Sequence, residues 1–206
     1  MTNQNRFKEL KAFDQQYNFP YLAGIDEAGR GPLAGPVVAA AVILPAECEL
    51  TGIDDSKKIS EAKRNILFDD INRFAVAIGI GICDEKIIDE INILQATFLA
   101  MKRAVSALTV DPGCLLIDGN KTMPQHISGH QFPDQVPVVK GDSKSLSIAA
   151  ASIVAKVTRD RIMKQYDEKY PEYGFARHKG YPTKAHFEAI EQFGICAIHR
   201  KSFLKR

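Results

Sequence analysis

Apolar residues gather in five short runs along the chain, separated by turn residues and by longer amphipathic stretches. Each run is rich in branched aliphatic or small residues and is short enough to form a buried strand. We therefore predict strands in residues 21–27, 36–44, 74–83, 114–118 and 135–140. The first two are separated only by residues 28–35, which are rich in glycine and proline and indicate a direct turn between these strands.

Apolar positions with helical spacing lie between these strands. An amphipathic run follows Ser60, a residue type that caps helices, and the same spacing predicts helices in residues 84–108 and 143–166. The remainder reads as a loop followed by a short helix. The order is β-β-α-β-α-β-β-α with a helical tail, which predicts an α/β fold in which helices cover a layered sheet. At 206 residues we expect a single core.

Composition places the chain among ordinary globular proteins, with 45% hydrophobic and 25% charged residues, and excludes a disordered or fibrous class. The formal net charge of +2 permits a polyanionic partner without arguing for one, although lysine and arginine are frequent after residue 140. The N-terminus lacks the apolar segment of a signal peptide, and the longest apolar stretch, residues 37–44, is too short to span a membrane. We expect a cytoplasmic protein without a membrane partner. Four distant cysteines fit reduced, mostly buried thiols: Cys48, Cys83, Cys114 and Cys196.

Four acids lie at the ends of predicted strands or at the start of a predicted helix, each beside glycine: Asp26, Glu27, Asp118 and Asp142. Ligands of layered α/β sheets bind where strand ends and loops converge. Acids that met there would repel each other unless cations held them ionised. Mg²⁺ or Mn²⁺ prefers such oxygen ligands, and two ions together support phosphodiester hydrolysis. The pattern is therefore compatible with a metal-dependent hydrolase.

The same residues have simpler interpretations, which the sequence leaves open. Aspartate and glutamate beside glycine commonly form turns, and Asp142 could cap the helix that follows it. Asp54, Asp55 and Asp84 lie in similar terminal positions. Spacing alone therefore does not decide between a metal site and ordinary turn residues.

A more specific pattern begins at residue 24. The segments "GIDEAGRGPLAGPVVAAAVIL", "DDSKKIS", "LLIDGN", "VVKGDSKSLSIAAASIVAKVTRD", "YPEYGFARHKGYPTKAH" and "HRKSF" resemble, in the same order, the motifs of bacterial ribonuclease HII, a type 2 ribonuclease H family. The resemblance implies a ribonuclease H-like fold, with a mixed five-stranded sheet flanked by helices and a C-terminal extension over about residues 168–206. It implies an endonuclease that cuts the RNA strand of RNA–DNA hybrids and nicks duplex DNA 5′ of embedded ribonucleotides. In this family the four acids hold two divalent ions, Mn²⁺ or Mg²⁺.

The resemblance also implies residues that bind substrate. Gly29, Arg30 and Gly31 would recognise the junction between a ribonucleotide and DNA, and Tyr181 would pack against the next deoxyribose. Glycine permits close backbone approach, and the 2′-hydroxyl distinguishes RNA from DNA. Arg30 as a turn residue held by a nearby carboxylate, and Tyr181 as ordinary packing, remain alternatives.

Phosphate contacts are expected from two further segments. Ser56 and Lys57 or Lys58 of "DDSKK" could contact the backbone near the cleaved bond, with a solvated turn as the alternative. His178, Lys179 and Lys184 could meet phosphates or simply lie on the surface.

Two other functions are compatible with parts of the pattern. Ribonuclease HIII has a related site behind a substantial N-terminal domain, but only 25 residues precede Asp26 here, and the loop reads GRG rather than a lysine-containing version. A catalytically silent module that binds hybrids is disfavoured because all four acids are present. From the resemblance we expect a monomer.

Overall fold

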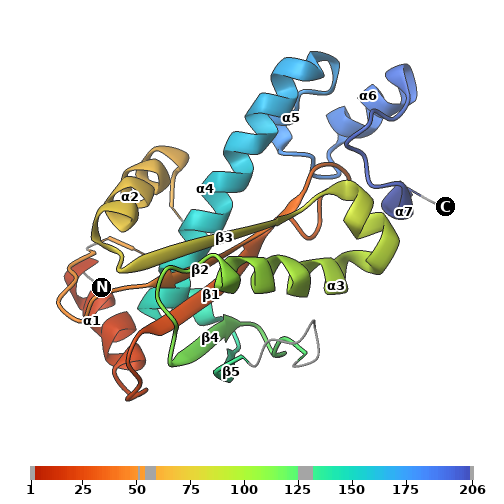
Figure 1. Ribbon diagram of the computed structural model, residues 1–206. Coiled ribbons are helices and arrows are strands. Elements are labelled where there is room, and N and C mark those ends of the chain that lie inside the picture. Colours follow the sequence, from red (N-terminus) through yellow and green to blue (C-terminus); the bar gives the residue numbers. More distant parts are fainter. Residues whose placement is uncertain (1–2, 51, 54–58, 125–131, 205–206) are drawn as a thin grey trace.

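The computed structural model describes residues 3–50, 52–53, 59–124 and 132–204. Its centre is one five-stranded sheet with the strand order β3-β2-β1-β4-β5 (Figure 1). The strands are β1 (Leu22–Ala28), β2 (Val37–Ile43), β3 (Ala77–Cys83), β4 (Cys114–Asp118) and β5 (Asp134–Val138). β2 pairs antiparallel with β1 and β3, whereas β4 pairs parallel with β1 and β5, so the predicted mixed sheet is confirmed.

Helices cover both faces of this sheet. They are α1 (Asn3–Asp14), α2 (Glu61–Phe74), α3 (Glu85–Ser106), α4 (Leu146–Lys169), α5 (Phe175–His178), α6 (Lys184–Phe193) and α7 (Lys201–Leu204). α3 lies on one face, and α4 crosses the other face and extends beyond the sheet (Figure 1). The turn between β1 and β2 reaches the same end of the molecule as α5, α6 and α7, which form the predicted helical C-terminal region (Figure 1).

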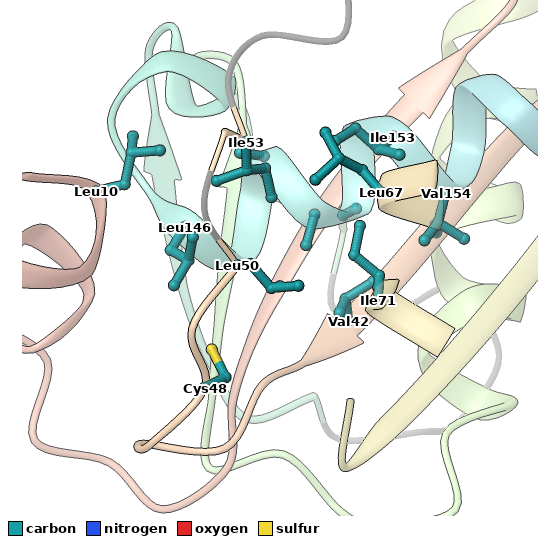
Figure 2. Close-up of a cluster of buried hydrophobic side chains, with 14 of the residues drawn as sticks. Leu10, Val42, Cys48, Leu50, Ile53, Leu67, Ile71, Leu146, Ile153 and Val154 are labelled. Carbon is teal, nitrogen blue, oxygen red and sulfur yellow. The ribbon is translucent and has the colours of Figure 1, made fainter. Parts of the chain in front are cut away.

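The alternation of side chains along β2 divides the interior into two cores. Val37, Ala39 and Ala41 point to the core under α3, whereas Ala40 and Val42 point to the core under α2 and α4. Figure 2 shows the second core, in which side chains of α2 and α4 close over Val42. Since neighbouring strand residues face opposite sides, a fully apolar strand such as β2 requires helices on both faces.

Gly24 allows α4 to lie directly on β1. A Cβ atom built on Gly24 would lie 2.1 Å from the backbone carbon of Ser147, a distance that no side chain tolerates. The contact fixes the start of α4 against the centre of the sheet and carries the next turns of the helix over the end of β1.

The structure differs from the sequence prediction at the N-terminus. No helix was predicted there, yet α1 packs onto α4 through Phe7 and Leu10, which are buried in the core under α2 and α4. Figure 2 labels Leu10 in this core. The predicted buried thiols are confirmed, since all four cysteines are unpaired and three of them are buried. Within the described ranges no helix has the length and apolarity needed to cross a membrane.

Candidate active site

Asp26 lies near the end of the central strand, beneath α4. Its side chain is buried, with 6% of its surface exposed. Asp26 Oδ1 accepts a hydrogen bond of 2.7 Å from the backbone N–H of Glu27, and the carboxylate also hydrogen-bonds to the side chain of Ser152 on α4. The close packing of α4 at Gly24 therefore positions the first acid from above.

Asp118 is hydrogen-bonded to the residue that precedes Asp142 in the chain. Asp118 is the last residue of β4, and its Oδ1 accepts a 2.7 Å hydrogen bond from the N–H of Gly141. Asp142 follows in a short 3₁₀ turn, Gly141–Ser143, and is buried. The cap of α4 is Ser145, whose side chain accepts from the N–H of Ile148, so the interpretation of Asp142 as the cap of this helix is wrong.

The carboxylate of Asp26 lies near enough to Glu27 and Asp118 to be repelled by their negative charges. The pKa of Asp26 is raised well above its usual value, first by burial and then by the negative charges of Glu27 and Asp118. Repulsion of this kind destabilises the ionised site, and a divalent cation would relieve it. The donors are carboxylate oxygens, which suit Mg²⁺ or Mn²⁺.

The carboxylates are nevertheless held by other partners in this structure. Over the described part of the chain, no three acidic, histidine or cysteine side chains stand so that they could hold a metal ion as they are. Gly141 engages Asp118, and Arg30 Nη1 lies 3.2 Å from Glu27 Oε1.

Glu27, Arg30 and Asp118 line one pocket of about 210 Å³ at this end of the sheet. Asn120 and Lys121 follow β4 on its rim, and residues of α3 form its apolar wall. The pocket thus combines two acids with two basic side chains. The basic side chains suit an anionic substrate, and the acids suit metal ions that such a substrate would also contact.

The turn after Glu27 has a fixed shape. Gly29 adopts φ +96°, a conformation that favours glycine, and a Cβ there would lie 2.0 Å from Nε of Arg159. Gly31 is exposed, and a Cβ on it would lie 3.6 Å from the ring of Tyr181. The structure therefore brings the predicted Gly29–Gly31 segment and Tyr181 together.

Tyr181 is not a core residue. Its surface is 42% exposed, and its ring lies above the buried guanidinium of Arg159, 6.0 Å from the ring centroid. Tyr181 therefore packs against Arg159 and is also accessible from outside, so its position is compatible both with ordinary packing and with a contact to a sugar. Arg30 does have the nearby carboxylate that the turn-residue alternative required, because it pairs with Glu27.

Two hydrogen-bonded histidines, His199 and His186, hold the backbone carbonyl of Tyr181. The N–H of Cys196 donates to Nδ1 of His199, so the His199 proton lies on Nε2, 3.1 Å from Nε2 of His186. His186 then carries its proton on Nδ1, 3.0 Å from the carbonyl oxygen of Tyr181. These bonds require both rings to be neutral. Burial and the neighbouring His186 lower the pKa of His199 to about 4, and burial also lowers the pKa of His186.

Lowering the pH should therefore decrease the free energy of unfolding through these histidines. A group with a depressed folded-state pKa stabilises the protein above its unfolded value of 6.5, and this stabilisation is lost as the pH falls toward about 4. We expect wild type to lose about 2 kcal/mol of unfolding free energy between pH 7.5 and pH 5 from His199 alone. Denaturant titrations at both pH values should show a smaller loss in His199→Gln, which would be less stable at pH 7.5. An equal loss in both proteins would contradict the neutral-imidazole assignment.

The other predicted phosphate contacts have mixed outcomes. Ser56 and Lys57 lie outside the described residues. Lys179 is buried and donates to the carbonyl of Ala176, while His178 uses both ring nitrogens on backbone groups, so their predicted placement toward phosphates is not supported. Lys184 is exposed, and its Nζ lies 3.6 Å from Oε1 of Glu188. Its contact with a phosphate stays a prediction.

Sequence reasoning missed the residues that shape the site from the inside. Ser152 touches Asp26, and Arg159 and Arg200 underlie the 28–36 turn. An arginine at position 159, within the apolar face of a helix, was the one available signal, because a buried charge requires a partner. Nothing in the local pattern distinguished Arg200 from its basic neighbours.

A mixed sheet of this order, with acids gathered where β1 and β4 end, defines the ribonuclease H-like class of nucleases. The fold matches solved structures of that class. The ribonuclease HII of the complex with PCNA from Archaeoglobus fulgidus has a TM-score of 0.75 at 27% identity, covering 91% of this chain and 96% of that one. The ribonuclease H2 from Pyrococcus horikoshii has a TM-score of 0.73 at 27% identity, covering 89% and 93%.

Sequence comparison narrows the class. The family model for ribonuclease HII matches residues 23–206. The ribonuclease HII of Acetivibrio thermocellus is 57% identical over 204 residues, which cover 98% of this chain and 77% of the relative. The chain belongs to the ribonuclease HII family. It is therefore a metal-dependent ribonuclease, a hydrolase of the ribonuclease H type that acts on RNA paired with DNA.

Proposed function

We propose that this enzyme is an endonuclease that hydrolyses the RNA strand of RNA–DNA hybrids and also nicks duplex DNA on the 5′ side of an embedded ribonucleotide. The products would carry 3′-hydroxyl and 5′-phosphate ends. The observation that carries the proposal is the continuity of two surfaces: Arg30 contacts Glu27 of the acidic site, and the adjoining Gly31 lies against Tyr181. A ribose held at Gly31 would thus place its neighbouring phosphate near the acids.

Asp26, Glu27, Asp118 and Asp142 would together hold two divalent ions, Mg²⁺ or Mn²⁺. Such ions, when bound, supply an activated water nucleophile and stabilise the departing oxygen. The raised pKa of Asp26 supports this assignment, since the repulsion that raises it is relieved by a cation.

The chain's own residues hold the acids in place for that chemistry. Ser152 and the N–H of Glu27 orient Asp26, and the N–H of Gly141 orients Asp118. Arg30 holds Glu27 and, once Glu27 turned away, would be available to a phosphate oxygen. Ser56 and Lys57 would grip the backbone near the cleaved bond.

Junction recognition would rest on Gly29, Arg30, Gly31 and Tyr181. Backbone N–H groups of the turn can donate to a 2′-hydroxyl oxygen, which DNA lacks. The ring of Tyr181 would lie on the next sugar and leave no room for a second hydroxyl. The enzyme would therefore prefer a ribonucleotide followed by DNA.

The test is cleavage of a labelled DNA duplex that contains one ribonucleotide, with Mg²⁺, Mn²⁺ or EDTA, beside the same duplex made wholly of DNA. We expect a metal-dependent nick 5′ of the ribose and no cleavage of the all-DNA duplex. Cleavage only within long RNA–DNA hybrids would overturn the junction assignment and leave the acidic site in place. Equal cleavage of both duplexes would overturn the role of the 2′-hydroxyl.

A further inference from the structure

Two buried arginines hold the turn between β1 and β2 from its inner side. Arg159 of α4 has 1% of its surface exposed, and Arg200, just before α7, has none exposed. Arg159 donates to the carbonyls of Ala34, Pro36 and Lys179, at 2.9 to 3.1 Å. Burial lowers the pKa of Arg159 to about 10 and that of Arg200 to about 9, so both guanidinium groups remain charged at neutral pH.

Of these two arginines, Arg200 is the one that hydrogen-bonds to the carbonyls of Gly29 and Arg30, the part of the turn assigned to the substrate. Its Nη2 lies 2.6 Å from the carbonyl oxygen of Gly29, and its Nη1 lies 3.0 Å from that of Arg30. The Nε of the same side chain lies 2.9 Å from the carbonyl oxygen of Gly35. One planar guanidinium therefore fixes two consecutive peptide units at one end of the turn and anchors them to the other end.

The inward direction of these carbonyls also fixes the direction of the N–H groups in the same peptide units. In a trans peptide, the carbonyl of one residue and the N–H of the next point in opposite directions. Because the carbonyls of Gly29 and Arg30 point inward to Arg200, the N–H groups of Arg30 and Gly31 point outward. Both residues are exposed, and neither N–H donates to any protein acceptor in the described ranges.

We propose that Arg200 is a positioning residue for ribose recognition, which presents the N–H groups of Arg30 and Gly31 to the 2′-hydroxyl of the substrate. This inference rests on the proposed function of the turn. A lysine cannot replace Arg200 in this role, since a single ammonium group cannot span three carbonyls that the guanidinium fork reaches together.

The decisive measurement is the ribose preference in binding, defined as the Kd for an all-DNA duplex divided by the Kd for the same duplex with one ribonucleotide. It is measured with Mg²⁺ in a cleavage-deficient Asp26→Asn background. A variant that merely unfolds in part loses affinity for both duplexes equally, so the ratio stays constant. We expect Arg200→Lys to lower the ratio about 3- to 10-fold, the range expected for weakened hydrogen bonds.

Tyr173→Phe provides a matched control in the same C-terminal region. It removes the bond from the Tyr173 hydroxyl to the carbonyl of Gly194 without touching the turn, and should leave the ratio unchanged. A ratio retained in Arg200→Lys would overturn the inference. A ratio near one in the parent Asp26→Asn protein would instead overturn the proposed recognition of ribose, and this inference with it.

A second measurement, made in the Asp26→Asn background without an arginine variant, tests whether the N–H groups of Arg30 and Gly31 contact the ribose, which the role of Arg200 requires. Amide hydrogen exchange of Arg30 and Gly31 should be fast in the free enzyme. It should slow with the duplex that contains one ribonucleotide and not with all-DNA at equal occupancy. Equal exchange in the two complexes would overturn the assignment of these N–H groups.

Discussion

Replacing Asp26 by asparagine should abolish cleavage and, at the same time, raise the thermal stability of the metal-free protein. The loss of activity should reach at least about 10³-fold, because one charged ligand of the proposed ion site is removed. The gain in stability follows from the raised pKa of Asp26. An acid whose folded-state pKa exceeds its unfolded value destabilises the protein as the pH rises through that interval, and asparagine carries no such charge.

Thermal unfolding in EDTA at neutral pH, with and without added Mg²⁺ or Mn²⁺, tests both parts. We expect the midpoint of Asp26→Asn to exceed that of wild type by a few degrees in EDTA, where 1 kcal/mol corresponds to about 2–4 °C for a chain of this size. Divalent ions should stabilise wild type more than the variant. Asp84→Asn is the matched control, because Asp84 directly follows the end of β3 and caps α3, a role that asparagine keeps. Wild-type activity in Asp26→Asn would remove this acid from the site.

Replacing Gly29 by alanine should destabilise the protein strongly, whereas the same change at Gly31 should not. The new Cβ at Gly29 would force a positive φ on alanine, lie 2.0 Å from Nε of Arg159 and lie 2.7 Å from the carbonyl oxygen of Pro36. Strain and a broken buried hydrogen bond together cost about 2–4 kcal/mol. At Gly31 the nearest atom to a new Cβ is 3.6 Å away, in Tyr181, so the expected change is within about 0.5 kcal/mol.

Chemical denaturation of the two variants measures this difference directly. Gly31→Ala should remain folded and yet bind the duplex with one ribonucleotide less tightly than wild type, since the added methyl group occupies the exposed surface beside Tyr181. Equal stability of the two variants would show that the turn adjusts freely. That outcome would contradict its fixed shape.

The central part of the fold could be predicted because it obeys simple periodicities. The branched aliphatics of β2 and the acids near the ends of β1 and β4 are local signals. The strands predicted from them are present in the structure. α1 was missed because its sequence, NQNRFKELKAFD, is mostly polar, and its buried Phe7 and Leu10 form too narrow an apolar stripe to stand out.

The site could be predicted only where one residue type implies one chemistry. The four acids and the glycine-rich turn stood out by residue type and position, while the family resemblance assigned their roles and that of Tyr181, and these roles stay predictions. Arg200 did not, because its function depends on carbonyl groups about 165 to 171 positions earlier, which no local pattern identifies. The pairing of His186 with His199 likewise depends on how the chain folds back after α6.

The long-range grip of Arg200 also sets an order of events during synthesis. All four acids have been made by residue 142, but the side chain that fixes the turn beside them follows about 60 residues later. At a translation rate of roughly 5–20 residues per second, this interval lasts about 3–12 s. During that time the nascent chain contains every acid that we assign to the ion site but lacks the side chain that we propose orients the amides for ribose. Since α4 also follows residue 142, packs on β1 at Gly24 and hydrogen-bonds to Asp26 through Ser152, both the acids and the turn reach their final arrangement only after the C-terminal part of the chain is made.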